Sequence, residues 1–233
     1  AMLEAAPNLK VVGRAGVGVD NIDVQACEER GVTVVHTPDA NSESVVEFVL
    51  TTMLSSLRTL NQVSGVLSQE EWDELRSASM TPKEFSETTL GIIGFGRIGG
   101  RLGRAACALG FNVLFCDLLK IEETHGCKQV ELDTLLSTSD VISIHVDGRN
   151  ENKHLCSATM FTSLKPDVLF MNSSRGFVVD ANALADFLSD HQSAHALLDV
   201  HDPEPMTNEY RLLHVSNVTL FPHIACKTTT ATT

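Results

Sequence analysis

A glycine-rich turn is the stretch of this chain with the clearest chemistry. The spacing Gly94-x-Gly96-x-x-Gly99 follows a short apolar run and opens a segment with helical periodicity. Gly94 permits a tight turn, Gly96 leaves the backbone open to a pyrophosphate, and Gly99 lets the helix pack close to a sheet. Backbone N–H groups at the start of this helix, from Arg97 onward, lack partners and attract phosphate. The spacing predicts a dinucleotide site, and a purely structural glycine turn is the alternative.

An acidic residue ends the next apolar run and bears on the choice of cofactor. Asp117 follows the run at 112–116, where a carboxylate can bind both hydroxyls of a ribose. A 2′-phosphate at the same place would meet a like charge. The sequence therefore favours NAD over NADP, and an ordinary exposed aspartate at the end of a strand is the alternative.

Four further segments each follow an apolar run, at 13–23, 172–176, 198–205 and 221–225. Ligands of an open α/β sheet bind just beyond the carboxyl ends of its strands. We therefore expect these segments to meet the glycine-rich turn in one cleft.

Apolar runs and helical patterns alternate along almost the whole chain. We expect strands at 9–13, 32–36, 90–93, 112–116, 141–145, 168–172, 196–200 and 218–221. We expect helices at 23–30, 44–67, 98–109, 132–136, 158–164 and 181–188. Several runs are nearly continuous in apolar residues, as in parallel strands that are buried on both faces. The alternation predicts an α/β fold with a doubly wound parallel sheet and right-handed crossovers.

The helix expected at 44–67 divides the chain into unequal parts. Residues 1–40 hold too few elements to bury a core and are expected to be part of a second domain. Residues 41–223 are expected to form a complete dinucleotide-binding domain, and 224–233 to begin a truncated return segment. The helix at 44–67 is apolar on more than one face, which predicts a subunit interface and a homodimer or larger homo-oligomer.

The composition limits the partners of the protein. A net charge of −13 argues against a nucleic-acid or anionic-membrane surface, although a few arginines can still bind a small anionic substrate. No apolar run approaches the roughly 20 residues of a membrane helix. The six cysteines form no CxxC pair and predict reduced thiols in a cytoplasmic protein. Because the histidines lack ligand spacing, we expect no metal site.

Together and in this order, these segments resemble the D-isomer-specific 2-hydroxyacid dehydrogenase family over essentially the whole chain. The resemblance implies a Rossmann-type NAD-binding domain, part of a flavodoxin-like substrate domain, and a homodimer. The Arg-Ala-Gly-Val-Gly-Val-Asp-Asn run at 14–21 looks most like the D-3-phosphoglycerate dehydrogenases of that family. Those enzymes oxidise D-3-phosphoglycerate to 3-phosphohydroxypyruvate with NAD, the first step of serine biosynthesis.

The resemblance also implies three catalytic residues. Arg175 matches the arginine that holds the substrate carboxylate and carbonyl, and His223 matches the acid/base. Glu204 matches the carboxylate that pairs with this histidine, with Asp202 as its nearest rival. A histidine suits proton transfer at neutral pH because its usual pKa is about 6.5. A neighbouring carboxylate stabilises the imidazolium, and a guanidinium can grip a carboxylate at two points.

Other matched positions lie on the cofactor side or the substrate side. The cofactor side comprises Gly94, Gly96, Arg97, Ile98, Gly99, Asp117, Ser173, Ser174, Asp199, Val17 and Ala225. The substrate side comprises Arg14, Ala15, Gly16 and Asn41, with Arg14 expected to face the phosphate of the substrate. The sequence departs from the family at His201, where an aromatic residue is usual, and at Val146-Asp147, where Thr-Pro or a similar pair is usual.

Family members have a further N-terminal part of the substrate domain and a return segment after the Pro222-His223 motif. We therefore expect this sequence to be a piece of a longer protein, one that binds NAD(H) but has little dehydrogenase activity alone. Two other functions stay open. One is a different D-2-hydroxyacid dehydrogenase, acting on glyoxylate, hydroxypyruvate or D-lactate. The other is an NAD(H)-sensing scaffold of the corepressor kind, which needs the nucleotide site but no turnover.

Overall fold

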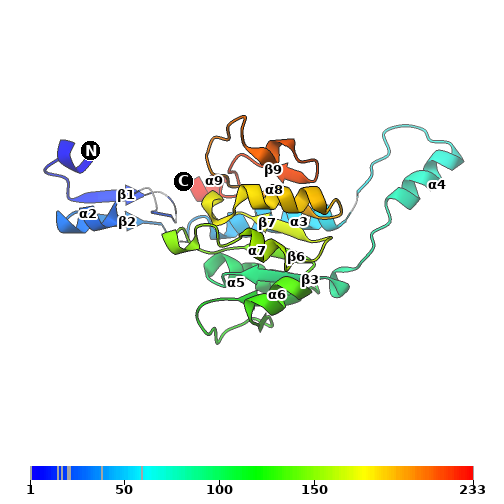
Figure 1. Cartoon of the computed structure of the whole chain (residues 1–233), viewed down its shortest axis with the longest axis horizontal. Helices are drawn as coiled ribbons and strands as arrows, with labels where there is room; N and C mark the ends of the chain where they lie inside the picture. Colours follow the sequence, from blue (N-terminus) through cyan, green and yellow to red (C-terminus); the bar gives the residue numbers. More distant parts are fainter. Residues whose placement is uncertain are drawn as a thin grey trace.

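The structure is a computed structural model of the chain, and it describes residues 2–14, 16, 18, 19, 22–37, 39–58 and 60–232. The described strands form a sheet of two and a sheet of seven strands. Figure 1 shows the small sheet on one side of the large one, while helix α4 (Gln69–Ala78) projects on the other side. The sequence predictions for Ala15 and Val17 lie outside the described residues.

The large sheet is parallel throughout and has the order β5-β4-β3-β6-β7-β8-β9. Its strands are β3 (Thr89–Ile93), β4 (Asn112–Cys116), β5 (Lys128–Gln129), β6 (Val141–Ile144), β7 (Leu169–Asn172), β8 (His195–Leu198) and β9 (Val218–Leu220). The chain winds outward from β3 to β5, then returns to the other side of β3 and winds outward again. This is the doubly wound sheet that the sequence predicts, with ligand sites expected at the reversal between β3 and β6.

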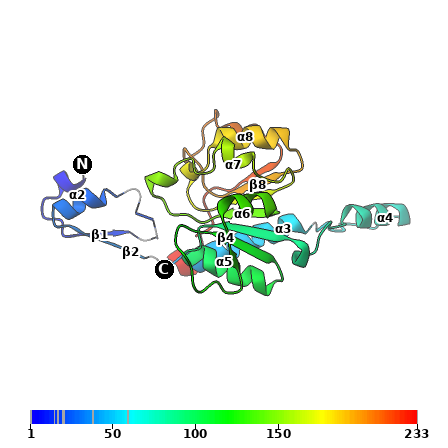
Figure 2. The ribbon, with the colours of Figure 1, turned by 60° about the horizontal axis from the view of Figure 1, so that its bottom comes forward.

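Helices cover both faces of this sheet (Figure 2). On one face, α6 (Leu132–Thr138), α7 (Ala158–Phe161) and α8 (Ala181–Asp190) pack on strand residues that include Ile142 and Phe170. On the other face, α3 (Ser42–Leu57) and α5 (Arg97–Ala108) pack on residues that include Ile92 and Met171. Every residue of β6 and β7 is buried, which explains why these strands are nearly continuous apolar runs.

The small sheet pairs β1 (Val11–Arg14) with β2 (Thr33–His36) in parallel, with α2 (Val24–Glu29) between them in the chain and α1 (Met2–Ala5) before them. Among its described apolar residues, Cys27 and Val32 are buried. Val11 and Val35 remain about half exposed, at 51% and 48%. These elements therefore cannot form a core of their own.

The predicted helix at 44–67 is wrong beyond Leu57. Helix α3 ends there, and Arg58 has an extended backbone. The described residues that follow include Asn, Ser, Gly and β-branched Val, which are poor helix formers, and residues 60–66 are exposed, so burial does not offset this. A second helix, α4, begins at Gln69, and its N-cap Ser68 forms a capping box with Glu71.

The remaining described elements are short: η1 (Phe85–Glu87), η2 (Asn150–Asn152), η3 (Gly176–Val178), η4 (Arg211–His214) and α9 (Thr229–Thr232). Within the described ranges, no helix combines the length and apolar character needed to cross a membrane.

Candidate functional site

The candidate residues gather along one edge of the large sheet, where its strands end. Gly94 follows β3, Asp117 follows β4, Arg175 follows β7, Glu204 follows β8 and His223 follows β9. Because neighbouring parallel strands end at the same edge, Gly94 and His223 share one surface although they are 129 positions apart in the chain.

The glycine-rich turn has the shape that a pyrophosphate needs. Gly94 has φ +90°, and a Cβ there would lie 2.8 Å from the backbone of His145. A Cβ on Gly99 would lie 2.1 Å from the carbonyl oxygen of Gly94. A Cβ on Gly96, in contrast, would meet nothing within 4 Å, so the space above this residue is open. Gly94 and Gly99 therefore permit close packing, and Gly96 lets a ligand approach the backbone of the turn.

Helix α5 begins directly behind this cradle. Its N-cap is Gly96, which has no side chain to bond the N–H groups of the first turn. Ile98 is half-buried against the core, while Arg97 is exposed and pairs with Asp39 at 3.1 Å. The open N-terminus of the helix and this guanidinium fit the phosphates of a dinucleotide.

Asp117 is held next to the cradle by two backbone groups. One carboxylate oxygen accepts the N–H of Phe95 at 2.7 Å, and the other accepts the N–H of Leu119 at 2.9 Å. Each carboxylate oxygen has a further lone pair, so the carboxylate can still accept hydroxyl groups of a ribose.

Asn172, which the sequence analysis did not single out as a site residue, shapes the loop after β7. It is 2% exposed, and its Oδ1 accepts the N–H and the hydroxyl of Ser174 at 3.0 and 2.8 Å. Its Nδ2 donates to the carbonyl of Arg175 at 2.9 Å. Ser173 Oγ is buried and has no partner among the described residues, so it is available to a ligand. The sequence signal for Asn172 is an amide at the end of an otherwise apolar strand.

Arg175 lies against the loop that follows β8. A Cβ on Gly176 would lie 1.9 Å from the carbonyl oxygen of His201, so the two loops are in direct contact. Arg175 donates to the carbonyl of Ser174 at 2.7 Å. The pKa of Asp147 is lowered, mainly by hydrogen bonds from Arg149 and further by the charge of Arg175. Asp147, which departs from the usual family sequence at this position, is therefore already paired with Arg149.

Glu204 and His223 form the acid/base arrangement at this edge. Oε2 of Glu204 lies 2.8 Å from Nδ1 of His223, and Oε1 accepts the backbone N–H of His201 at 2.8 Å. Partial burial opposes ionisation of Glu204, but these two hydrogen bonds hold the pKa of its carboxyl below the usual value. A charged Glu204 requires the hydrogen on Nδ1 of His223, and this leaves Nε2 for a proton transfer.

Asp199 lies beneath the loop that carries His223. It is 1% exposed, and its two oxygens accept the N–H groups of Ile224 and Ala225, both at 2.8 Å. Burial raises the pKa of this carboxyl, although both hydrogen bonds favour its charged form. Ala225 is itself 4% exposed and packs in the core beside α3.

The substrate-side residues are not all brought to this edge. Arg14 is the last residue of β1 in the small sheet and donates to the carbonyl of Gly18 at 3.3 Å, while Gly16 follows this strand and bonds Thr37. Asn41 is the N-cap of α3, and its buried Oδ1 has no partner among the described residues. In the described part of the chain, no group of three His, Cys, Asp or Glu is placed to hold a metal ion.

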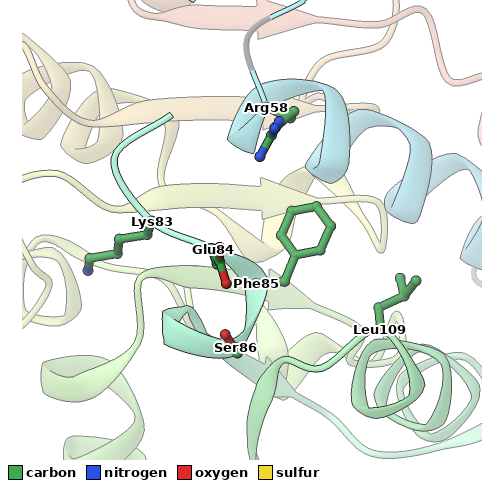
Figure 3. Close-up of a pocket in the computed structure, with 6 residues that line it drawn as sticks. All are labelled: Arg58, Lys83, Glu84, Phe85, Ser86 and Leu109. Atoms are coloured by element: carbon green, nitrogen blue, oxygen red, sulfur yellow. The ribbon is translucent and has the colours of Figure 1, made fainter. Parts of the chain in front are cut away.

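A hollow at the opposite edge of the sheet is unrelated to this site. Figure 3 shows its lining, which comes from the end of α3, the segment before β3 and the end of α5: Arg58, Lys83, Glu84, Phe85, Ser86 and Leu109. Residues that precede β3 and β4 lie at the amino ends of the strands, away from the glycine cradle.

The class of protein follows from this geometry together with the likeness to known families. Residues 50–225 match the D-isomer specific 2-hydroxyacid dehydrogenase, NAD binding domain. The chain belongs to this family and carries its NAD-binding domain.

Individual relatives carry different substrate names. The D-3-phosphoglycerate dehydrogenase of Archaeoglobus fulgidus is 37% identical over 230 residues, which cover 97% of this chain and 43% of that protein. The hydroxypyruvate reductase of Thermotoga maritima is 36% identical over 99% of this chain and 75% of its own length. The crystal structure of D-lactate dehydrogenase from Aquifex aeolicus, complexed with NAD and lactic acid, has a TM-score of 0.82 at 30% identity, covering 99% of this chain and 74% of that one. The chain thus spans less than half of the first of these relatives.

Proposed function

We propose that the chain provides the cofactor domain and the acid/base pair of an NAD-dependent D-3-phosphoglycerate dehydrogenase. The observation that supports this most is the Glu204–His223 pair at 2.8 Å, on the same edge of the sheet as the glycine cradle. A dinucleotide site alone would suit many functions, whereas a histidine paired with a carboxylate beside it suits proton transfer to or from a substrate hydroxyl.

The proposed roles follow from the chemistry of each group. NAD, when bound, supplies the acceptor for a hydride. The cradle at Gly96, the guanidinium of Arg97, the carboxylate of Asp117 and the hydroxyl of Ser173 would hold it. Nε2 of His223 takes the proton of the substrate hydroxyl, and Glu204 stabilises the imidazolium that results. Arg175 holds the substrate carboxylate by paired hydrogen bonds and so fixes which face of the substrate is presented.

The choice of a phosphorylated substrate depends on Arg14. This residue opens the 14–21 run that resembles the phosphoglycerate enzymes, and a guanidinium is well suited to bind a phosphate. Arg14 lies in the small sheet, so this role requires the small sheet to close over the edge that carries Arg175. Glyoxylate, hydroxypyruvate or D-lactate remains the alternative substrate within the same chemistry.

The test is NADH oxidation by the full-length protein with 3-phosphohydroxypyruvate, hydroxypyruvate, glyoxylate and pyruvate offered in parallel. We expect the phosphorylated acid to be preferred, and Arg14→Ala to weaken its use selectively. A preference for an unphosphorylated acid would keep the mechanism and change the substrate. Tight NADH binding without turnover of any acid would favour the corepressor-like scaffold.

We further propose a homodimer, with the projecting segment at 60–84 as its contact surface. None of the residues of α4 is buried, and Leu60, Val66, Trp72 and Met80 are exposed at 75%, 102%, 46% and 78%. Apolar residues on a projecting segment are stabilised when a second copy covers them. Sedimentation of the wild type and of Trp72→Glu tests this, since a wild-type monomer would contradict the proposal.

We also propose that the chain divides into a partial domain at 1–40 and a cofactor domain at 41–223. A cytoplasmic location is a further proposal. The two separate sheets support the division, and six cysteines without a disulfide support the location. Limited proteolysis near residue 40 and fractionation of cells would test them.

A further inference from the structure

His201 joins the two loops that carry Glu204 and His223. Its side chain is 7% exposed, and its Nε2 lies 2.7 Å from the carbonyl oxygen of Phe221. Its Nδ1 lies 3.4 Å from the hydroxyl of Tyr210, and its backbone N–H donates to Glu204 Oε1 at 2.8 Å. One residue therefore contacts the carboxylate through its backbone and the histidine loop through its ring.

The hydrogen positions in this network follow from its partners. The carbonyl of Phe221 can only accept, so Nε2 of His201 must carry a hydrogen. Nδ1 of the neutral ring is then bare and accepts from the hydroxyl of Tyr210. Burial, together with the nearby carboxylates of Asp202 and Glu204, raises the pKa of Tyr210 to about 12, so this hydroxyl keeps its proton.

The loop needs such an anchor because of the backbone of His223. This residue has φ +55°, a left-handed conformation that non-glycine residues rarely adopt and that persists only when the surroundings enforce it. Before His223, Phe221 donates its N–H to Leu198 at 2.8 Å and accepts from His201. After His223, the next two N–H groups bond Asp199. Residues 198–201 thus hold the chain on both sides of His223.

We propose that His201 is a positioning residue for the Glu204–His223 pair, acting through its Nε2–H on the Phe221 carbonyl. The catalytic consequence of this role rests on the proposed function. The positioning of His223 itself requires no substrate or cofactor. A phenylalanine could fill the same space but has no hydrogen to donate. A buried histidine that merely satisfies its own polar atoms would stabilise the fold without affecting the state of His223.

The titratable groups around His201 must be considered together. Asp199 and Glu204 lie on the same loop as His201, while His223 approaches from the loop after β9. Tyr210 also contacts His201, and the centroids of the two rings are 5.7 Å apart. Any variant must therefore remove the Nε2 donor without adding a charge among these groups.

The experiment compares His201→Leu, which removes the donor, with His201→Gln, whose amide can restore it. The matched control is His195→Leu, because His195 also joins β8 to β9, through Thr219 at 2.9 Å, but at the beginning of β8. The ¹⁵N NMR spectrum of the imidazoles reports the tautomer of His223 in the full chain without cofactor. We expect hydrogen on Nδ1 of His223 in the wild type, in His201→Gln and in the control, and a mixture with the other tautomer in His201→Leu.

A second readout is turnover by the full-length protein. We expect kcat to fall about 10- to 100-fold in His201→Leu, as for a misplaced acid/base, with KM for NADH unchanged and with recovery in His201→Gln. An unchanged tautomer and kcat in His201→Leu would overturn the positioning role. A wild-type spectrum with the hydrogen of His201 on Nδ1 would also overturn the positioning role, and this measurement does not depend on the folding of any variant. If the tautomers are as expected but no 2-oxo acid is reduced by the wild type, the proposed function fails and the positioning role stands.

Discussion

Oε2 of Glu204 lies 2.8 Å from Nδ1 of His223, at the point where the loops after β8 and β9 meet. Oε1 of the same carboxylate is occupied by the N–H of His201, so the carboxylate cannot rotate without losing a hydrogen bond. The pair is therefore oriented before any ligand arrives. Such orientation contributes to catalysis because no reorganisation is needed at the moment of proton transfer.

Glu204→Gln should lower kcat of the full-length protein by about 100-fold or more, because the amide cannot stabilise the imidazolium of His223. NADH affinity, measured by fluorescence, should stay within about twofold, since no step of cofactor binding uses this charge. The control is Asp202→Asn, two residues away. A large loss of kcat in Asp202→Asn with none in Glu204→Gln would make Asp202 the partner of the histidine.

The central strands of the large sheet were predictable because burial on both faces makes them nearly continuous apolar runs. The strand expected at 112–116 is exact, and the other predicted strands are within two residues at each end. Strand β5 has two residues, too few for any pattern. The error at 44–67 arose because the apolar positions of α3 are continued by Leu60 and Val63, which have a similar spacing but remain exposed.

From the sequence, a site residue can be predicted only where its residue type and spacing alone indicate its chemistry. The glycine spacing and the position of Asp117 after a strand can be interpreted from the sequence, since each glycine has a separate steric reason. The contact of the His201 ring cannot, because it joins loops that are 20 residues apart in the chain and depends on how β8 and β9 are aligned.

Asp140 gives a pH dependence to the stability of the large sheet. It accepts hydrogen bonds from Lys83 at 2.8 Å, the N–H of Thr89 at 2.8 Å and Lys165 at 3.0 Å. Partial burial opposes its ionisation, but these partners lower its pKa in the folded protein. A lowered pKa contributes stability that is present above the unfolded value of about 3.9 and is lost as the pH falls through the folded value.

Asp140→Asn should therefore lower the free energy of unfolding by about 1–3 kcal/mol at pH 7, and by less below about pH 4. Urea denaturation at both pH values measures this. The control is Asp186→Asn, whose partner Arg211 lies at 2.6 Å but whose carboxyl is 65% exposed. That change should have a smaller effect than Asp140→Asn, because solvent screens an exposed ion pair. Equal costs at both pH values would contradict the role of the Asp140 charge.

Gly99 and Gly100 form a matched pair in the first turns of α5. A Cβ on Gly99 would lie 2.1 Å from the Gly94 carbonyl oxygen, whereas the nearest atom to a Cβ on Gly100 is a carbon of Phe95 at 3.8 Å. Gly99→Ala should destabilise the protein by about 1–3 kcal/mol through overpacking and should weaken NAD binding, since the helix must move away from the cradle. Gly100→Ala should be neutral or stabilising by up to about 1 kcal/mol. Thermal unfolding and NAD titration of both variants test this, and equal behaviour would contradict the assigned packing.

Asp117 should decide between NAD and NADP. Its carboxylate is fixed by the N–H groups of Phe95 and Leu119, and it can accept ribose hydroxyls through its remaining lone pairs. Asp117→Ser should raise the Kd for NAD about 10-fold, as for the loss of hydrogen bonds to a charged group, and should lower the Kd for NADP because the repulsion of the 2′-phosphate is removed. Fluorescence titration with NADH and NADPH measures both constants in the chain itself, without any substrate. The control is Glu123→Gln, a nearby change of the same charge at a residue whose side chain is 86% exposed. If Glu123→Gln shifts the ratio of the two constants as much as Asp117→Ser does, the preference arises from the overall negative charge of the protein and not from a carboxylate that meets the ribose.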